Sequence, residues 1–154
     1  MSSLFFDSSA LVKRYIAEIG SRWAVSLLDL SVGHTIIVAS ITQVEVAAAL
    51  AARYRAGSIS LVERDELVDL LALHFDTHYQ QVLVEAPVLD RAVSLTQSHR
   101  LRGYDAVQLA AALTLNAALV GAALPPLTMI SADDDLNAAA QAEGLAADTP
   151  NAHP

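Results

Sequence analysis

The chain of 154 residues contains no cysteine, a single lysine (Lys13) and no basic residue after Arg102. The absence of cysteine excludes a disulfide framework, a thiolate nucleophile and a zinc–sulfur site. It also fits a reducing compartment. No basic segment precedes an apolar run at the N-terminus, and Asp7 comes too early for a secretory signal. We therefore expect a cytoplasmic protein.

Charge is scarce and unevenly distributed. Charged residues make up 17% of the chain, and the formal net charge is −8. Residues 1–102 hold every lysine and arginine, whereas residues 103–154 hold six acids and no base. A protein that binds nucleic acid through a general positive field shows the opposite balance. The sequence thus indicates either a partner other than nucleic acid or a cation held among the acids.

One stretch, from Ala106 to Ala132, carries no charge and is long enough to cross a membrane. Polar and helix-breaking residues interrupt it, among them Gln108, Asn116 and the pair Pro125-Pro126. The segment that follows is acidic, whereas a membrane span is usually flanked by basic residues on one side. We therefore expect a buried helix, a loop and a buried strand, and no membrane association.

Short apolar runs alternate with helical patterns along the chain. Strands are expected near residues 4–6, 35–39, 82–84 and 127–130, and helices near 11–19, 21–30, 42–56, 60–75, 87–99, from 104 onward, and 134–143. This alternation predicts a single-domain α/β fold, with a parallel β-sheet flanked by helices on both faces. We expect the domain to span residues 1–145, and the polar tail 146–154 to fray.

Four acids lie close to the ends of the expected strands or at a helix start. Asp7 and Asp133 follow strands, Glu45 lies just past the second strand, and Asp105 begins the uncharged helix. Because parallel strands end at one edge of the sheet, these acids are expected to gather there. Carboxylates without histidine or cysteine suit Mg²⁺ or Mn²⁺. A bound cation would recruit phosphate to this acidic face.

Each acid also has a simpler structural explanation. Thr42-x-x-Glu45 has the form of a capping box, and Asp105-x-x-Gln108 is an analogous pairing. Asp7, Ser8 or Ser131 could cap a helix N-terminus. Capping is the better interpretation of any one acid alone, whereas the placement of all four at one edge favours a shared metal site.

Four segments carry a family resemblance: DSSALVKRY from Asp7, TQVEVA from Thr42, LRGYDAVQLA from Leu101 and SADDDL from Ser131. In order, spacing and neighbours they resemble PIN-domain ribonucleases of the VapC toxin type over essentially the whole chain. The resemblance implies a PIN-like fold and a magnesium-dependent endoribonuclease, with Mn²⁺ able to substitute. It also implies the toxin role in a type II toxin–antitoxin pair, a cognate antitoxin and a homodimer.

The resemblance further implies that Asp7, Glu45, Asp105 and Asp133 are the metal-binding catalytic acids, with Asp134 and Asp135 as alternatives at the fourth position. Ser131 matches a hydroxyl residue of the same pocket. Ser8 and Arg102 are candidate pocket or RNA contacts, with Arg102 suited to a phosphate. By contrast, we interpret Lys13 and Arg14 as a solvated helix face, and the i,i+4 pair His74 and His78 as helix surface.

Other functions fit less well. A phosphoaspartate receiver needs a lysine after its last strand, and a haloacid-dehalogenase-type phosphatase needs an acid at the position of Ser9. Two alternatives stay open: a catalytically silent PIN-like module that binds RNA or protein, and a solitary RNA-processing nuclease.

Overall fold

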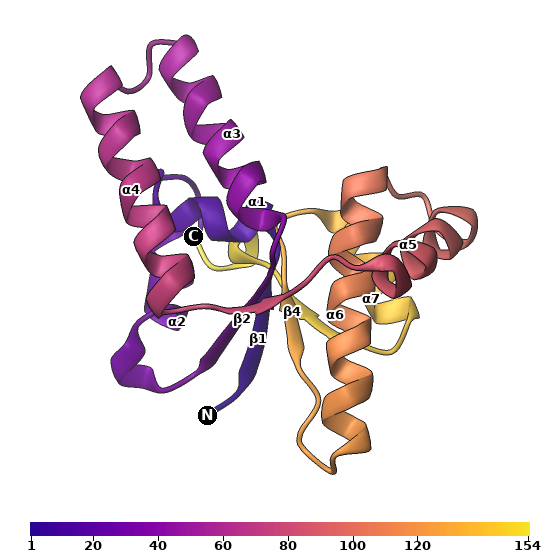
Figure 1. Cartoon of the computed structure of the whole chain (residues 1–154). Helices are drawn as coiled ribbons and strands as arrows, with labels where there is room; N and C mark the ends of the chain where they lie inside the picture. Colours follow the sequence, from indigo (N-terminus) through magenta and orange to yellow (C-terminus); the bar gives the residue numbers. More distant parts are fainter.

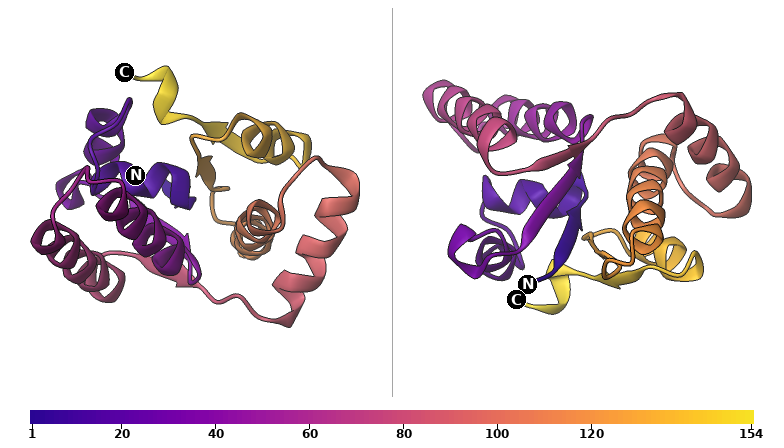
Figure 2. Two further views of the ribbon diagram at one scale, coloured as in Figure 1. Left: turned by 90° about the horizontal axis from the view of Figure 1, so that it is seen from above. Right: turned by 60° about the horizontal axis from the view of Figure 1, so that its bottom comes forward.

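A computed structural model describes all 154 residues. Five parallel strands form one sheet in the order β3-β2-β1-β4-β5, with helices on both faces (Figures 1 and 2). The strands are β1 (Ser3–Phe6), β2 (Thr35–Ala39), β3 (Gln80–Val82), β4 (Thr128–Ile130) and β5 (Ala146–Asp148). The helices are α1 (Ser8–Leu11), α2 (Ser21–Leu27), α3 (Thr42–Arg55), α4 (Leu61–Thr77), α5 (Ala86–Ser98), α6 (Gly103–Gly121) and α7 (Asp134–Ala142), with 3₁₀ turns η1 (Val12–Arg14), η2 (Leu30–Val32) and η3 (Pro150–Ala152). The predicted fold class is confirmed.

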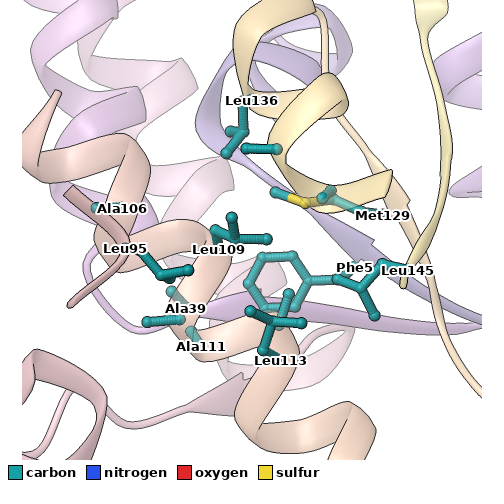
Figure 3. Close-up of a cluster of buried hydrophobic side chains, with 14 of the residues drawn as sticks. Phe5, Ala39, Leu95, Ala106, Leu109, Ala111, Leu113, Met129, Leu136 and Leu145 are labelled. Carbon is teal, nitrogen blue, oxygen red and sulfur yellow. The ribbon is translucent and has the colours of Figure 1, made fainter. Parts of the chain in front are cut away.

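The central strand β1 separates two hydrophobic cores. Phe5 contributes to the core beneath α5, α6 and α7, whereas Leu4 and Phe6 contribute to the core beneath α1 to α4. Figure 3 shows Phe5 and Met129 facing α6 in the first of these cores. A strand buried on both faces needs apolar residues at successive positions, which explains the run from Leu4 to Phe6.

The uncharged stretch folds as expected into α6, a loop and β4. Seven residues of α6 are buried, among them Leu109 and Leu113, because this helix packs between the sheet and α5. No helix in the structure combines the length and the apolar character that crossing a membrane requires.

The expected fraying of residues 146–154 is wrong. Ala146 to Asp148 form edge strand β5, which pairs with Thr128 to Ile130 of β4. Pro150 is buried, and its carbonyl oxygen lies so close to Gly20 that a Cβ there would approach it to 2.1 Å. Ala146 to Asp148 gave no strand pattern because they include no β-branched or aromatic residue; main-chain pairing to β4 makes them a strand.

Two side chains expected on the surface are buried. Lys13 is 5% exposed, and its Nζ donates to the Ile19 carbonyl at 2.8 Å and forms an ion pair with Glu18 at 3.2 Å. His74 is also buried, with Nδ1 2.8 Å from the Tyr15 hydroxyl. Both interpretations as solvent-facing residues are therefore wrong, because each side chain is buried and hydrogen-bonded within the fold.

Candidate functional site

The four predicted acids lie at the edge of the sheet where the strands end and the helices begin. Asp7 follows β1, Glu45 is in the first turn of α3, Asp105 is in the first turn of α6, and Asp133 precedes α7. Figure 1 shows α3 and α6 beginning at the same end of the strands, on opposite faces of the sheet. Besides loss of hydration, the negative charges of Asp133 and Glu45 raise the pKa of Asp105. The negative charge of Asp105 in turn raises the pKa of Asp7, as the smallest of the causes that act on it.

Asp7 is 2% exposed and surrounded by donors. Its carboxylate accepts hydrogen bonds from Ser131 Oγ at 2.7 Å, from Ser9 Oγ at 2.8 and 2.9 Å, and from the Ala10 N–H at 3.0 Å. Burial raises the pKa of Asp7 from 3.8 to about 6, although the bonds from Ser131 and Ser9 oppose the shift. Asp7 is also the N-cap of α1, so for this residue the capping interpretation holds.

Glu45 is held by two side chains from other elements. Ser8 Oγ donates to its Oε2 at 2.6 Å, and Gln108 Nε2 donates to its Oε1 at 3.0 Å. The same Gln108 nitrogen donates to Thr42 Oγ1 at 2.9 Å. Thr42 lies inside α3, whose N-cap is Ile41 without a side-chain cap. The capping boxes considered for Thr42–Glu45 and Asp105–Gln108 are therefore absent.

Asp105 is half-buried, and its carboxylate accepts no hydrogen bond from the protein. Loss of hydration, with a smaller contribution from the charges of Asp133 and Glu45, raises the pKa of Asp105 from 3.8 to about 6, while Arg102 opposes the shift. Asp133 caps α7 by accepting from the Leu136 N–H at 2.9 Å, whereas Asp134 and Asp135 are exposed. Capping thus accounts for Asp7 and Asp133 but not for Glu45 or Asp105.

Two hydroxyls link the ends of β1 and β4. Ser131 donates to Asp7 and accepts from the Asp133 N–H at 3.1 Å, and Ser9 bonds Asp7 while accepting from the Ala132 N–H at 2.9 Å. Ser131 was expected near this pocket. Ser9 was not, because a serine after a strand end gives no signal beyond capping.

Gln108 was also missed as a site residue. It is 1% exposed, and its Oε1 atom is buried without a partner. A buried unsatisfied carbonyl is costly, so the side chain is not explained by stability alone. The available signal was a glutamine inside an otherwise apolar run, one turn after Asp105.

The side chains do not form a ready-made metal cage: no three His, Asp or Glu residues converge as a metal-holding group. The oxygens of Asp7 are bonded to hydroxyls and a helix N–H, whereas those of Asp105 are free of protein donors. The donors are all oxygens, which suits Mg²⁺ or Mn²⁺. Magnesium usually retains several waters and takes one or two carboxylates. The four acids therefore fit an ion that keeps some of its water ligands better than an ion that all four carboxylates enclose.

Comparison with known proteins identifies the fold and the family of the chain. The PIN domain family matches residues 4–142. One similar solved structure is FitAcB from Neisseria gonorrhoeae, with 14% identity and a TM-score of 0.67; the match covers 96% of this chain and 97% of that one. A second is a toxin–antitoxin complex from Klebsiella pneumoniae, with 18% identity and a TM-score of 0.62; the match covers 96% of this chain and 97% of that one. A third is VapC20 from Mycobacterium tuberculosis, described as a sarcin–ricin loop cleaving toxin. It has 15% identity and a TM-score of 0.60, and the match covers 88% of this chain and 94% of that one.

No curated protein matches the sequence. The identities to the solved structures are low, so these structures show a shared fold rather than a shared activity. The family match, by contrast, covers most of the chain. The protein belongs to the PIN-domain family.

Proposed function

We propose that the protein is a metal-dependent endoribonuclease and the toxin of a toxin–antitoxin pair. The observation that carries this proposal is Asp105, which lies beside Asp133 and Glu45 without a donor of its own. Repulsion of this kind is costly in a protein unless a cation or another function uses it. The fold is one that toxins of this type share, and the solved neighbours include a toxin that cleaves RNA.

In this proposal, Asp7, Glu45, Asp105 and Asp133 surround a hydrated Mg²⁺ or Mn²⁺ ion, which keeps several waters and takes one or two of the carboxylates as direct ligands. When bound, such an ion polarises a phosphate and lowers the pKa of a water molecule. Ser9 and Ser131 orient Asp7, and Ser8 and Gln108 orient Glu45. Arg102 is exposed at the rim, where its guanidinium would contact a phosphate of the RNA.

The test is cleavage of a panel of RNAs by three proteins: wild type, Asp105→Asn, and the matched control Asp69→Asn, an exposed acid on α4. Wild type and the control should cut in Mn²⁺ and stop in EDTA, and Asp105→Asn should not cut. Hydrolysis by water leaves 5′-phosphate and 3′-hydroxyl ends. Cyclic 2′,3′-phosphate products, or no metal-dependent cleavage on any RNA, would contradict the proposal. The second outcome would favour a silent binding module.

We also propose a binding site for the antitoxin. A groove of about 550 Å³ lies between α4 and the segment after η1, with apolar Ile16, Leu67 and Leu70 and acidic Glu63 and Glu66 among its lining residues. Apolar walls with acids suit an amphipathic basic helix. A small upstream gene that encodes a DNA-binding segment and a basic amphipathic tail would support this pairing. Its absence would favour a solitary RNA-processing nuclease.

Assembly and location form part of the same proposal. We propose a homodimer in the cytoplasm, where RNA and an antitoxin would both be present. The solved neighbour from Klebsiella pneumoniae was crystallised as a toxin–antitoxin complex. Light scattering of the purified protein, alone and with the product of the upstream gene, would measure the mass of each assembly.

A further inference from the structure

A polar cleft of about 370 Å³ lies where α5 ends and α6 begins. Its lining residues are Thr96, His99, Arg100, Leu101, Arg102 and Asp135. It is separate from the antitoxin groove proposed above, which is lined by residues of α3, α4 and the segments beside them. The volume is close to the lower end of small-ligand sites, about 300–1,000 Å³. This is room for one ligand group of nucleotide size.

The cleft adjoins the acidic site. Asp135, in its wall, acts on the pKa of Asp105, and Arg102 acts electrostatically with both Asp105 and Asp133. The cleft therefore lies next to the acids in the first turns of α6 and α7. The elements that meet here are the C-terminal end of α5 and the first turns of α6 and α7.

Arg100 and Arg102 are cations without a carboxylate partner. Both are exposed, and neither takes part in any of the five ion pairs, although Asp135 lines the same cleft. His99, by contrast, is paired, with Nε2 2.7 Å from Glu143 Oε1. Two free guanidinium groups beside an acidic site provide a local attraction for phosphate that the net charge of −8 does not.

Tyr104 supplies an aromatic ring beside these cations. The residue is 47% exposed, and its hydroxyl accepts from Arg102 Nη1 at 2.7 Å. An exposed aromatic next to arginine is typical of sites that bind single strands, where a base stacks on the ring and phosphate contacts the cation. In a duplex the bases are already stacked on each other, so the ring gains little.

We propose that the cleft binds one nucleotide of single-stranded RNA next to the bond that is cut, with phosphate on Arg100 and Arg102 and the base on Tyr104. That this RNA is a substrate rests on the proposed nuclease function, whereas the binding itself does not. The cleft and the ring of Tyr104 would therefore fix the position of one unpaired nucleotide beside the acids.

The test measures binding in EDTA, so that no metal-dependent cleavage occurs, by fluorescence anisotropy between about 50 and 200 mM salt. The probes are a labelled single-stranded RNA and the same strand in a duplex. Arg100→Gln/Arg102→Gln should weaken single-strand binding and lower the slope of log affinity against log salt by about 1.4, or 0.7 for each lost phosphate contact. The control Arg55→Gln, an exposed arginine at the far end of α3, should leave both unchanged.

The ring is tested separately. Tyr104→Leu should lower single-strand affinity about tenfold with little change in the salt slope, because stacking is lost and charge is not. Tyr104→Phe should bind close to wild type, because it keeps the ring. Melting curves of each variant show whether the fold is retained. A double arginine variant that does not fold is replaced by Arg100→Gln and Arg102→Gln made separately, each of which should lower the slope by about 0.7.

Three results would overturn the cleft proposal: equal affinity for the duplex, unchanged binding in the arginine variants, or equal loss in Tyr104→Leu and Tyr104→Phe. If the arginines only offset the acids, their removal changes the metal-free melting temperature and not the salt slope. Cleavage by wild type with unchanged binding in the variants rejects the cleft and keeps the nuclease. If wild type does not cleave but its binding depends on Tyr104 and the two arginines, the cleft proposal is kept and the nuclease proposal is rejected.

Discussion

The end of β1 and the first turn of α6 each hold an acid whose pKa is raised mainly by loss of hydration, but the surroundings of the two acids differ. Asp7 is almost fully enclosed and accepts hydrogen bonds from Ser9, Ser131 and a helix N–H, and burial raises its pKa to about 6. Asp105 is half-buried with no donor, and neighbouring acids add to the loss of hydration. The fold uses Asp7 as a cap and a junction, whereas Asp105 has no structural use that the contacts explain.

The largest expected effect is on cleavage. Asp105→Asn should lower metal-dependent cleavage by about a hundredfold or more, since even partners of metal ligands cost about 10–100-fold. Its metal-free melting temperature at pH 7 should equal or exceed that of wild type, because the folded state disfavours the ionised carboxylate. Cleavage rates in Mn²⁺ measure the first effect, and thermal melts in EDTA measure the second. A variant that melts clearly lower would show that Asp105 is structural.

Asp7→Asn completes this comparison. It should lose cleavage equally but gain no stability, because the amide has one oxygen and cannot accept from Ser9 and Ser131 as the carboxylate does. Its melt in EDTA should lie at or below wild type. Equal stabilisation of both variants would contradict the distinction between the two acids.

The next effect concerns the side chain that holds Glu45. Gln108→Met keeps the volume and removes the donor to Glu45, so we expect cleavage to fall about tenfold, the lower range for partners of metal ligands. Stability should change by less than about 1 kcal/mol, because the buried oxygen without a partner is removed too. The exposed Gln141→Met is the control. A large loss of stability with unchanged cleavage would assign Gln108 to the fold alone.

A smaller effect is expected with pH. A carboxyl whose folded pKa is about 6 rather than 3.8 contributes stability that is present at low pH and lost as pH rises through this window. Buried His74 acts in the opposite direction, because burial lowers its pKa from 6.5 to about 4. We therefore compare wild type with Asp105→Asn, in which His74 is the same.

In EDTA, the melting temperature of wild type relative to Asp105→Asn should fall by a few degrees between pH 4 and about 6, and then level off. At pH 7, Mn²⁺ should raise the melting temperature of wild type more than that of the variant, because the ion binds the native state. Parallel curves without metal and equal shifts with Mn²⁺ would show that Asp105 is not part of a charge cluster.

The smallest effect is expected at the hydroxyls. Ser9→Ala removes the hydrogen bond that the hydroxyl shares between the two oxygens of Asp7, and the acceptor of the Ala132 N–H. It should cost about 1 kcal/mol, or 2–4 °C in melting temperature. Because Ser9 lowers the pKa of Asp7, that pKa should rise above about 6. Ser8→Ala, which removes a hydrogen bond to Glu45 only, should leave the pKa of Asp7 unchanged. NMR titration of the carboxyl carbons distinguishes the two variants.

The sequence by itself determined most of the elements, β5 excepted, and their arrangement as layers. Alternating apolar runs and helical patterns predicted the parallel sheet, and in such a sheet Asp7 and Asp133, which follow strands, are brought to one edge. This is local information, since it depends only on where each strand ends. The same reasoning placed Glu45 and Asp105 near that edge, although the capping boxes considered for them do not form.

Only the tertiary structure decided the partners of these side chains. Ser9 reaches Asp7 and Ala132, Gln108 reaches Glu45, and Ala146 pairs with Thr128, each across elements that no local pattern connects. The same holds for Lys13 and His74, whose burial depends on neighbours from other segments. Hydrogen bonds form over about 3 Å, so they depend on the packing and register of whole elements, which the spacing of residues along the chain does not specify.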